Sequence, residues 1–89
     1  MVSPEESGAS QPNVVMYCRS WCGDCMRAKR WLESNGVEYT EIDIEAQPEG
    51  AEVVREIAGK IVTPTFVIGD GDTCVDFDPE RLKELLAMP

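Results

Sequence analysis

The sequence predicts a single α/β domain: a four-stranded mixed sheet between two layers of helices, in the order β-α-β-α-β-β-α. Three observations lead to this fold class. The 89 residues are 43% apolar and 28% charged, which suits one small globular domain. Short β-branched runs alternate with segments of helical periodicity, as in strand–helix–strand units. A Gly-Asp-Gly-Asp turn at residues 69–72 predicts a hairpin, which adds antiparallel strands to the sheet.

The first half of the domain is expected to be a strand–helix–strand unit. Residues 1–12 are rich in Ser, Gly, Pro and Glu and are expected to be disordered, so the folded domain should cover residues 13–89. Val14–Cys18 is a short apolar run suited to a buried strand. A helix is predicted from Gly23 to about Asn35, where Asn35 and Gly36 cap its end. A parallel strand from Val37 to Ile44 should follow.

The second half is expected to be a helix, a hairpin and a last helix. Pro48 should open the helix and Gly59 close it, with a buried side made of Val53, Val54, Ile57 and Ala58. Residues 65–68 and 73–75 are the predicted hairpin strands. Asp78 should cap the last helix at Pro79, whose inward side chains are Leu82, Leu85 and Leu86.

The charge balance excludes some classes of partner. Seventeen acidic and eight basic residues give a net charge of −9, which disfavours general binding to nucleic acid or anionic membranes. The sequence shows neither a basic leader with an apolar stretch nor an apolar run long enough to span a bilayer. We therefore expect a soluble, cytoplasmic protein that acts as a monomer.

The four cysteines carry the chemistry, and the chain has no histidine. Without histidine, Cys–His catalytic pairs, histidine-ligated zinc and histidine-based serine triads are excluded. In a reducing compartment, cysteines at this density indicate metal binding or redox catalysis rather than a disulfide framework. They are Cys18, Cys22, Cys25 and Cys74.

Cys22 and Cys25 form a Cys-x-x-Cys motif where a strand ends and a helix begins. The N–H groups at a helix start favour a thiolate, which is the reactive form of cysteine. Cys22 is therefore the predicted nucleophile, and Cys25, one turn further along, is the predicted resolving thiol. Trp21, directly before the nucleophile, is expected to contact the substrate.

A local excess of positive charge surrounds this motif. Residues 19–30 contain four basic residues and a single acidic residue, Asp24, which gives a local charge of +3. We expect this basic segment, rather than the helix dipole alone, to keep Cys22 ionised. Arg19 is best placed to do so, because Arg27 and Lys29 start further along the helix where solvent screens them.

Thr63 and Pro64 stand at the start of the third predicted strand. Proline is tolerated at the first residue of a strand. A cis Thr63–Pro64 bond would turn the N–H and C=O groups of Thr63 outward, where they could pair with a substrate peptide. From base rates alone, a cis bond has a frequency of roughly 5%.

These features resemble the glutaredoxin branch of the thioredoxin superfamily over about residues 13–88. The element order, a tyrosine five residues before the first active cysteine, and a Thr-Pro about 40 residues later all match. The stretch around Cys22 and residues 42–45 look most like mycoredoxins. Residues 75–81 are more similar to the NrdH redoxins, which reduce ribonucleotide reductase.

The resemblance implies a thioredoxin-like fold, a cis bond before Pro64 and thiol–disulfide oxidoreductase activity. It implies reduction of protein disulfides or of mixed disulfides with small thiols, with no bound cofactor or metal. Glutathione, another small thiol or thioredoxin reductase would supply the electrons, and the sequence leaves this choice open. The implied substrate-binding residues are Arg19, Trp21, Thr63, Pro64 and Asp76.

Two metal-binding alternatives stay open at this point. All four cysteines could ligate a structural zinc ion, although zinc modules usually pair two Cys-x-x-Cys knuckles and this chain has one. A [2Fe–2S] cluster could be shared by two subunits, and Gly23 in place of the proline common in glutaredoxins favours this. Cys18 and Cys74 are otherwise expected to be small buried hydrophobic residues.

Overall fold

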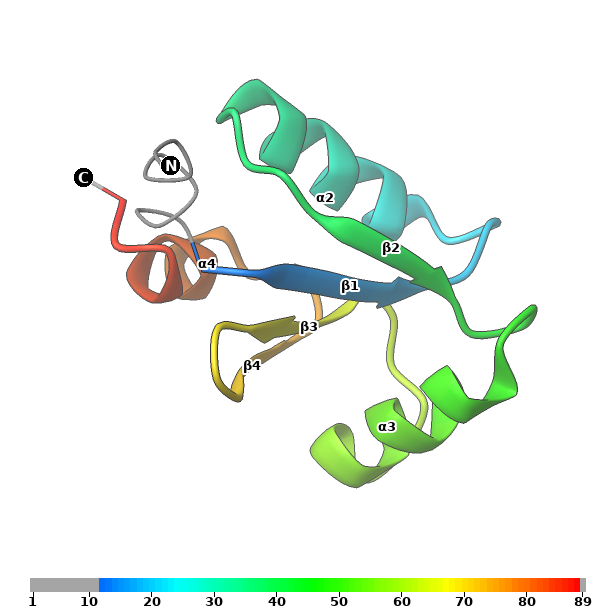
Figure 1. Ribbon diagram of the computed structural model, residues 1–89. Coiled ribbons are helices and arrows are strands. Elements are labelled where there is room, and N and C mark those ends of the chain that lie inside the picture. The colour runs from blue at the N-terminus through cyan, green and yellow to red at the C-terminus, as the bar shows by residue number, and fades with distance from the viewer. Residues whose placement is uncertain (1–11, 89) are drawn as a thin grey trace, which may run out of the picture.

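Residues 12–88 are described in the computed structural model of the chain, and they fold in the predicted element order (Figure 1). The disordered segment predicted for residues 1–12 lies outside the described residues except for Pro12. No helix within residues 12–88 has the length and apolar character needed to cross a membrane. The elements are β1 (Val14–Cys18), α2 (Gly23–Ser34), β2 (Thr40–Asp43), α3 (Pro48–Ala58), β3 (Thr65–Ile68), β4 (Asp72–Val75) and α4 (Pro79–Leu85).

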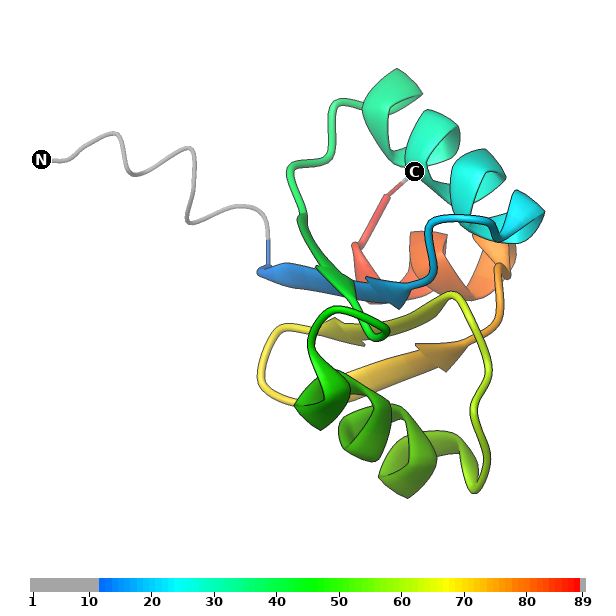
Figure 2. The ribbon, with the colours of Figure 1, turned by 90° about the vertical axis from the view of Figure 1, so that its right-hand side faces the viewer.

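The four strands form one mixed sheet in the order β2-β1-β3-β4. β1 runs parallel to β2 and antiparallel to β3, and β4 is antiparallel to β3. α2 and α4 cover one face of the sheet and α3 covers the other, so the molecule has the three predicted layers (Figure 2). In this register the end of β1 lies beside the start of β3, because Tyr17 pairs with Thr65. The loop after β1 and the loop before β3 therefore meet at one end of the two central strands, which we call the active-site edge.

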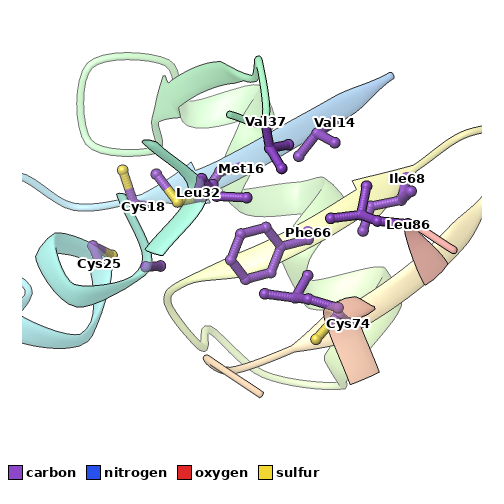
Figure 3. Close-up of a cluster of buried hydrophobic side chains, with 12 residues drawn as sticks. Val14, Met16, Cys18, Cys25, Leu32, Val37, Phe66, Ile68, Cys74 and Leu86 are labelled. Atoms are coloured by element: carbon purple, nitrogen blue, oxygen red, sulfur yellow. The ribbon is translucent and has the colours of Figure 1, made fainter. Parts of the chain in front are cut away.

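The main core lies between the sheet and the pair α2 and α4 (Figure 3). Alternate residues of β1, namely Val14, Met16 and Cys18, point into it, as period-2 alternation requires. On the opposite face, α3 approaches the sheet at Gly50. A Cβ there would lie 3.1 Å from the Ile42 side chain and 3.3 Å from the Tyr17 side chain, so any larger residue would have to push these side chains aside.

The second strand is shorter than the predicted Val37–Ile44 and begins only at Thr40. The backbone of Val37 instead closes α2, because its N–H donates to the carbonyl of Leu32 at 2.9 Å. In addition, β1 begins at Val14 and first pairs at Val15 with Thr40. The residues before Tyr39 therefore have no residue of β1 beside them in the ladder.

The predicted buried sides of α3 and α4 are only partly correct. Val54 is fully buried, but Val53, Ile57 and Ala58 are half-buried, because α3 has one side on the sheet and no further layer outside it. In α4 the predicted Leu82 and Leu86 are buried, whereas Leu85 lies at the core margin.

Candidate active site

Cys22 occupies the N-cap position of α2. Its backbone is extended, with φ −87° and ψ 119°, and its Sγ accepts a hydrogen bond from the Cys25 N–H at 3.2 Å. Ser, Thr, Asp and Asn usually fill this position because their oxygens satisfy the free N–H groups of the first turn. A sulfur placed there meets the same donors and the positive end of the helix dipole, and both favour a thiolate.

The pKa of Cys22 is lowered below its ordinary value. Partial burial opposes ionisation, but it is outweighed by hydrogen bonds with the side chains of Cys25 and Thr63 and with the Cys25 backbone, and then by the charge of Arg19. The Thr63 carbonyl lies 3.5 Å from the sulfur and accepts a hydrogen bond from the thiol form, which favours the proton. The donors outweigh this carbonyl, so Cys22 is the more acidic thiol of the motif.

Cys25 has the opposite character. Its side chain is 1% exposed and faces the core, whereas that of Cys22 is partly open to solvent. Burial, followed by the hydrogen bond and charge of Cys22, raises the pKa of Cys25 to about 11. The backbone N–H of Arg19 and the Thr63 side chain act in the other direction. The two thiols therefore differ in both accessibility and charge.

The segment before β3 faces this pair of thiols. The Thr63–Pro64 bond is cis, which confirms the expectation drawn from the resemblance. Pro64 is buried, and its carbonyl accepts a hydrogen bond from the Asp76 N–H at 2.8 Å. Because the Thr63 carbonyl also contacts Cys22, the structure brings Thr63, Pro64 and Asp76 to the active-site edge, beside the motif.

Arg19 and Trp21 lie on the exposed side of the motif. The Arg19 guanidinium stacks over the Trp21 ring at 5.1 Å, and the indole N–H donates to Glu45 Oε2 at 3.2 Å. Trp21 is nevertheless 66% exposed, so it is held in one orientation without being buried. Sequence reasoning missed Glu45, because nothing in its spacing shows that the loop after β2 returns to the motif.

The expectation that the basic segment keeps Cys22 ionised is supported only in part, because the charge of Arg19 does lower the pKa of Cys22 but other groups lower it more. Hydrogen bonds precede the charge of Arg19 among the groups that lower the pKa of Cys22. Arg27 pairs with Asp24, and Lys29 pairs with Glu41 at 2.9 Å. These two cations therefore neutralise nearby carboxylates instead of acting on the thiol.

Within residues 12–88 the four cysteines do not come together as a tetrahedral metal site would require. Among the described residues, no three Cys, Asp or Glu side chains converge in a way that could hold a metal ion. Cys74 lies on β4, where its thiol contacts the carbonyls of Asp76 and Asp78. The [2Fe–2S] cluster shared by two subunits with small-molecule thiols stays a prediction.

Comparisons with known proteins agree with this geometry. The sequence profile of the family described as Glutaredoxin matches residues 14–72. A Mycobacterium tuberculosis protein named as a glutaredoxin is 35% identical over 74 residues, covering 82% of this chain and 88% of its own. A Pseudomonas aeruginosa glutaredoxin is 42% identical over 60 residues, covering 66% and 70%.

Among solved structures, NrdH-redoxin from Escherichia coli superposes with a TM-score of 0.74 at 27% identity, covering 86% of this chain and 99% of its own. A thioredoxin-like fold together with these family matches defines a thiol–disulfide oxidoreductase. The chain belongs to the glutaredoxin family.

Proposed function

We propose that this chain reduces disulfides with Cys22 as the nucleophile and Cys25 as the resolving thiol. The observation that carries the proposal is the N-cap position of Cys22, where its sulfur accepts the Cys25 N–H at 3.2 Å. The pKa of Cys22 is lowered there, while that of Cys25 is raised to about 11. Because thiolates are the attacking species, Cys22 is the thiol of the pair that attacks first.

The reaction then has two exchange steps. The Cys22 thiolate attacks a sulfur of the substrate disulfide, a mixed disulfide forms, and the other substrate sulfur leaves as a thiolate. Cys25 next attacks Cys22, which forms the Cys22–Cys25 disulfide and releases the second substrate thiol. The first step removes the negative charge of Cys22, and that charge is one cause of the raised pKa of Cys25. Cys25 therefore becomes easier to ionise when it is needed.

The active-site edge beside Cys22 is suited to a protein substrate. Of the described residues, the exposed large hydrophobic ones are Trp21, Met26 and Val75. Trp21 and Met26 flank the motif along the chain, and Val75 pairs with Thr65, next to Pro64. We assign Trp21 to apolar contact with the substrate and the backbone of Thr63 to pairing with an extended substrate segment. Pro64 fixes this loop.

Two charged residues lie beside the Cys22 site. Arg19 and Asp76 would contact polar groups of a substrate or of a small thiol. Glutathione, another small thiol or thioredoxin reductase would restore the dithiol, and the cytoplasm is the compartment that keeps it reduced. The E. coli NrdH-redoxin is described as a glutaredoxin-like protein with a thioredoxin-like activity profile, which supports testing thioredoxin reductase as a donor for this chain.

Single-cysteine variants test the assignment. Cys22→Ser should abolish reduction of both protein disulfides and small-thiol mixed disulfides. Cys25→Ser should abolish reduction of protein disulfides and retain reduction of mixed disulfides, which needs a single thiol. Full activity of Cys22→Ser would show that another residue is the nucleophile.

The electron donor is identified by two parallel assays of the wild type on one protein disulfide. One assay contains glutathione and its reductase, and the other contains thioredoxin reductase; each follows oxidation of nicotinamide cofactor. Turnover in one assay alone identifies the donor class. Turnover in neither assay would point to a different small thiol.

A further inference from the structure

Cys18 is a buried thiol for which the chemistry of Cys22 and Cys25 provides no role. It ends β1 on the face covered by α2, and its side chain is 0% exposed. Its thiol donates a hydrogen bond to Glu41 Oε2 at 3.1 Å. Burial, this hydrogen bond and the neighbouring Cys25 raise the pKa of Cys18 far above its ordinary value. Cys18 therefore keeps its proton and is no nucleophile.

Glu41 is held as a carboxylate beside Cys18. The same Oε2 atom accepts a hydrogen bond from Lys29 Nζ at 2.9 Å, and both side chains are about one third exposed. Hydrogen bonds from Lys29 and Cys18 hold the pKa of Glu41 below its ordinary value, although partial burial and the charge of Asp43 oppose this. Near neutral pH, an anionic acceptor is therefore always available to the Cys18 thiol.

Cys18 is also next to the resolving thiol. Cys18 and Cys25 belong to the same buried cluster (Figure 3), and the Cys25 side chain is one of the groups that raise the pKa of Cys18. Groups that can donate to an anionic Cys25 are the backbone of Arg19, the side chain of Thr63 and the thiol of Cys18. Of these three, Cys18 is the one whose hydrogen-bond partner is a carboxylate.

We propose that Cys18 is a positioning residue for the resolving step, and that its thiol proton is shared between Glu41 and Cys25. This inference rests on the proposed roles of Cys22 and Cys25. As Cys25 loses its proton to solvent, the Cys18 thiol turns from Glu41 and donates to the Cys25 sulfur. That sulfur attacks Cys22, the bond from Cys22 to the substrate sulfur breaks, and the electron pair leaves on the substrate thiolate. Cys18 keeps its proton and its oxidation state.

Glu41 competes with Cys25 for the donor. The carboxylate holds the Cys18 proton and adds a negative charge near Cys25. Both effects keep Cys25 protonated until Cys22 has formed the mixed disulfide with the substrate. The titratable groups around this cluster come from α2, β2 and the segment before β2, and they are Cys22, Cys25, Lys29, Tyr39, Glu41 and Asp43.

The test is a single-turnover measurement of the resolving step. Cys22 is first converted to a mixed disulfide with a chromogenic aromatic thiol, and release of that thiol by Cys25 is followed by absorbance from pH 5 to pH 10. The midpoint of this rate profile reports the pKa of Cys25 when Cys22 carries no charge. A wild type that forms no mixed disulfide at Cys22 would contradict the proposed function, independently of Cys18.

Variants at Cys18 give the first comparison. Cys18→Ala should raise the midpoint by about 1 and slow release at pH 7 about tenfold, because one donor to the Cys25 thiolate is lost. Cys18→Ser retains a hydroxyl donor and should restore the profile. An unchanged midpoint in Cys18→Ala, or equal shifts in both variants, would show that Cys18 only fills space.

Glu41→Gln gives a comparison that does not disturb the core. It should lower the midpoint, whereas the matched control Glu56→Gln, which removes one carboxylate from exposed α3 on the other face, should leave it unchanged. Because Glu41→Gln also frees the charge of Lys29, it is repeated in Cys18→Ala, where its effect should shrink. Equal effects in both backgrounds would overturn the coupling through Cys18.

Discussion

Two helices on the same face of the sheet, α2 and α4, begin and end in the same way. In α2 the Cys22 sulfur accepts the Cys25 N–H, and in α4 the Asp78 carboxylate accepts the Arg81 N–H; both hydrogen bonds are 3.2 Å long. Each cap residue has an extended backbone. One cap is a carboxylate oxygen, and the other is a sulfur that can also form a covalent bond.

The ends of the two helices also match. After α2, the N–H groups of Gly36 and Val37 donate to the carbonyls of Glu33 and Leu32. After α4, the N–H groups of Ala87 and Met88 donate to Glu84 and Lys83. This pattern needs a positive φ at the first residue beyond the cap, which is +69° at Gly36 and +56° at Ala87. The comparison shows that the reactive site uses ordinary helix capping, with sulfur in place of oxygen.

The largest effect should come from replacing the sulfur cap. Cys22→Ser and Cys22→Ala should both lose disulfide reduction, because neither side chain forms a thiolate. Their free energies of unfolding should differ by about 1 kcal/mol in favour of Cys22→Ser, because a serine hydroxyl still accepts the Cys25 N–H. Urea unfolding of the two variants measures this difference. Equal stabilities would show that a side-chain acceptor at this cap position contributes nothing to stability.

Stability should depend on alkaline pH through the buried thiols. The pKa values of Cys18, Cys25 and Cys74 are raised, so their contribution is present below the ordinary value of 9.0 and lost as the pH rises toward the folded-state values. Cys22, with its lowered pKa, contributes in the opposite direction. Three thiols outweigh one, and the free energy of unfolding should fall by at least about 1 kcal/mol between pH 8 and pH 10. Urea titrations across this range measure it, and rising stability would contradict the assignment.

Substitutions at the residues just beyond the two helices should change the free energy of unfolding in opposite directions. Gly36→Ala should cost about 1 kcal/mol of unfolding free energy through the backbone alone, because an added Cβ would meet no atom within 4 Å. Ala87→Gly should stabilise by about 0.5 kcal/mol, since it relieves a positive φ near the chain end. Thermal unfolding of both variants tests this, and a destabilised Ala87→Gly would contradict it.

The carboxylate cap should matter for stability and not for chemistry. Asp78→Ala should lower the free energy of unfolding by about 1 kcal/mol, because the Arg81 N–H loses its partner. The rate of alkylation of Cys22 should not change. Asp78→Asn, which retains an oxygen acceptor, is the matched control and should recover most of the stability. A change in the alkylation rate at Cys22 would show that the two caps are coupled.

The smallest effect should come from the charges around the sulfur cap. Arg19→Ala should raise the pKa of Cys22 by about 0.5 or less, because hydrogen bonds precede this charge and solvent screens it. Asp24→Asn should lower the pKa of Cys22 only slightly although Asp24 is close to Cys22 in the sequence, since Arg27 already pairs with Asp24. Alkylation rate against pH measures both. A rise in the pKa of Cys22 well above 1 in Arg19→Ala would show that the basic segment is the main cause of the lowered pKa.

Local signals in the sequence predicted most of the elements. Pro48, Asp78 and Pro79 start helices where expected, and the predicted turn joins two antiparallel strands, although it covers only residues 69–71 because Asp72 already pairs with Ile68. β2 was predicted too long, because a strand's length depends on its neighbour in the ladder, and β1 pairs only from Val15 onward on that side. Capping is a short-range property, whereas pairing is not.

The sequence alone determined that Cys22 would lie at a helix start, since a β-favouring run, a Cys-x-x-Cys motif and a helical stripe follow one another within 20 residues. Only the tertiary structure decided what surrounds the two thiols. Thr63 reaches Cys22, Glu45 reaches Trp21, and Glu41 reaches Cys18 across more than 20 residues of chain. These contacts depend on strand register and on the packing of α2 against the sheet, so neither spacing nor composition reveals which group donates to a buried sulfur.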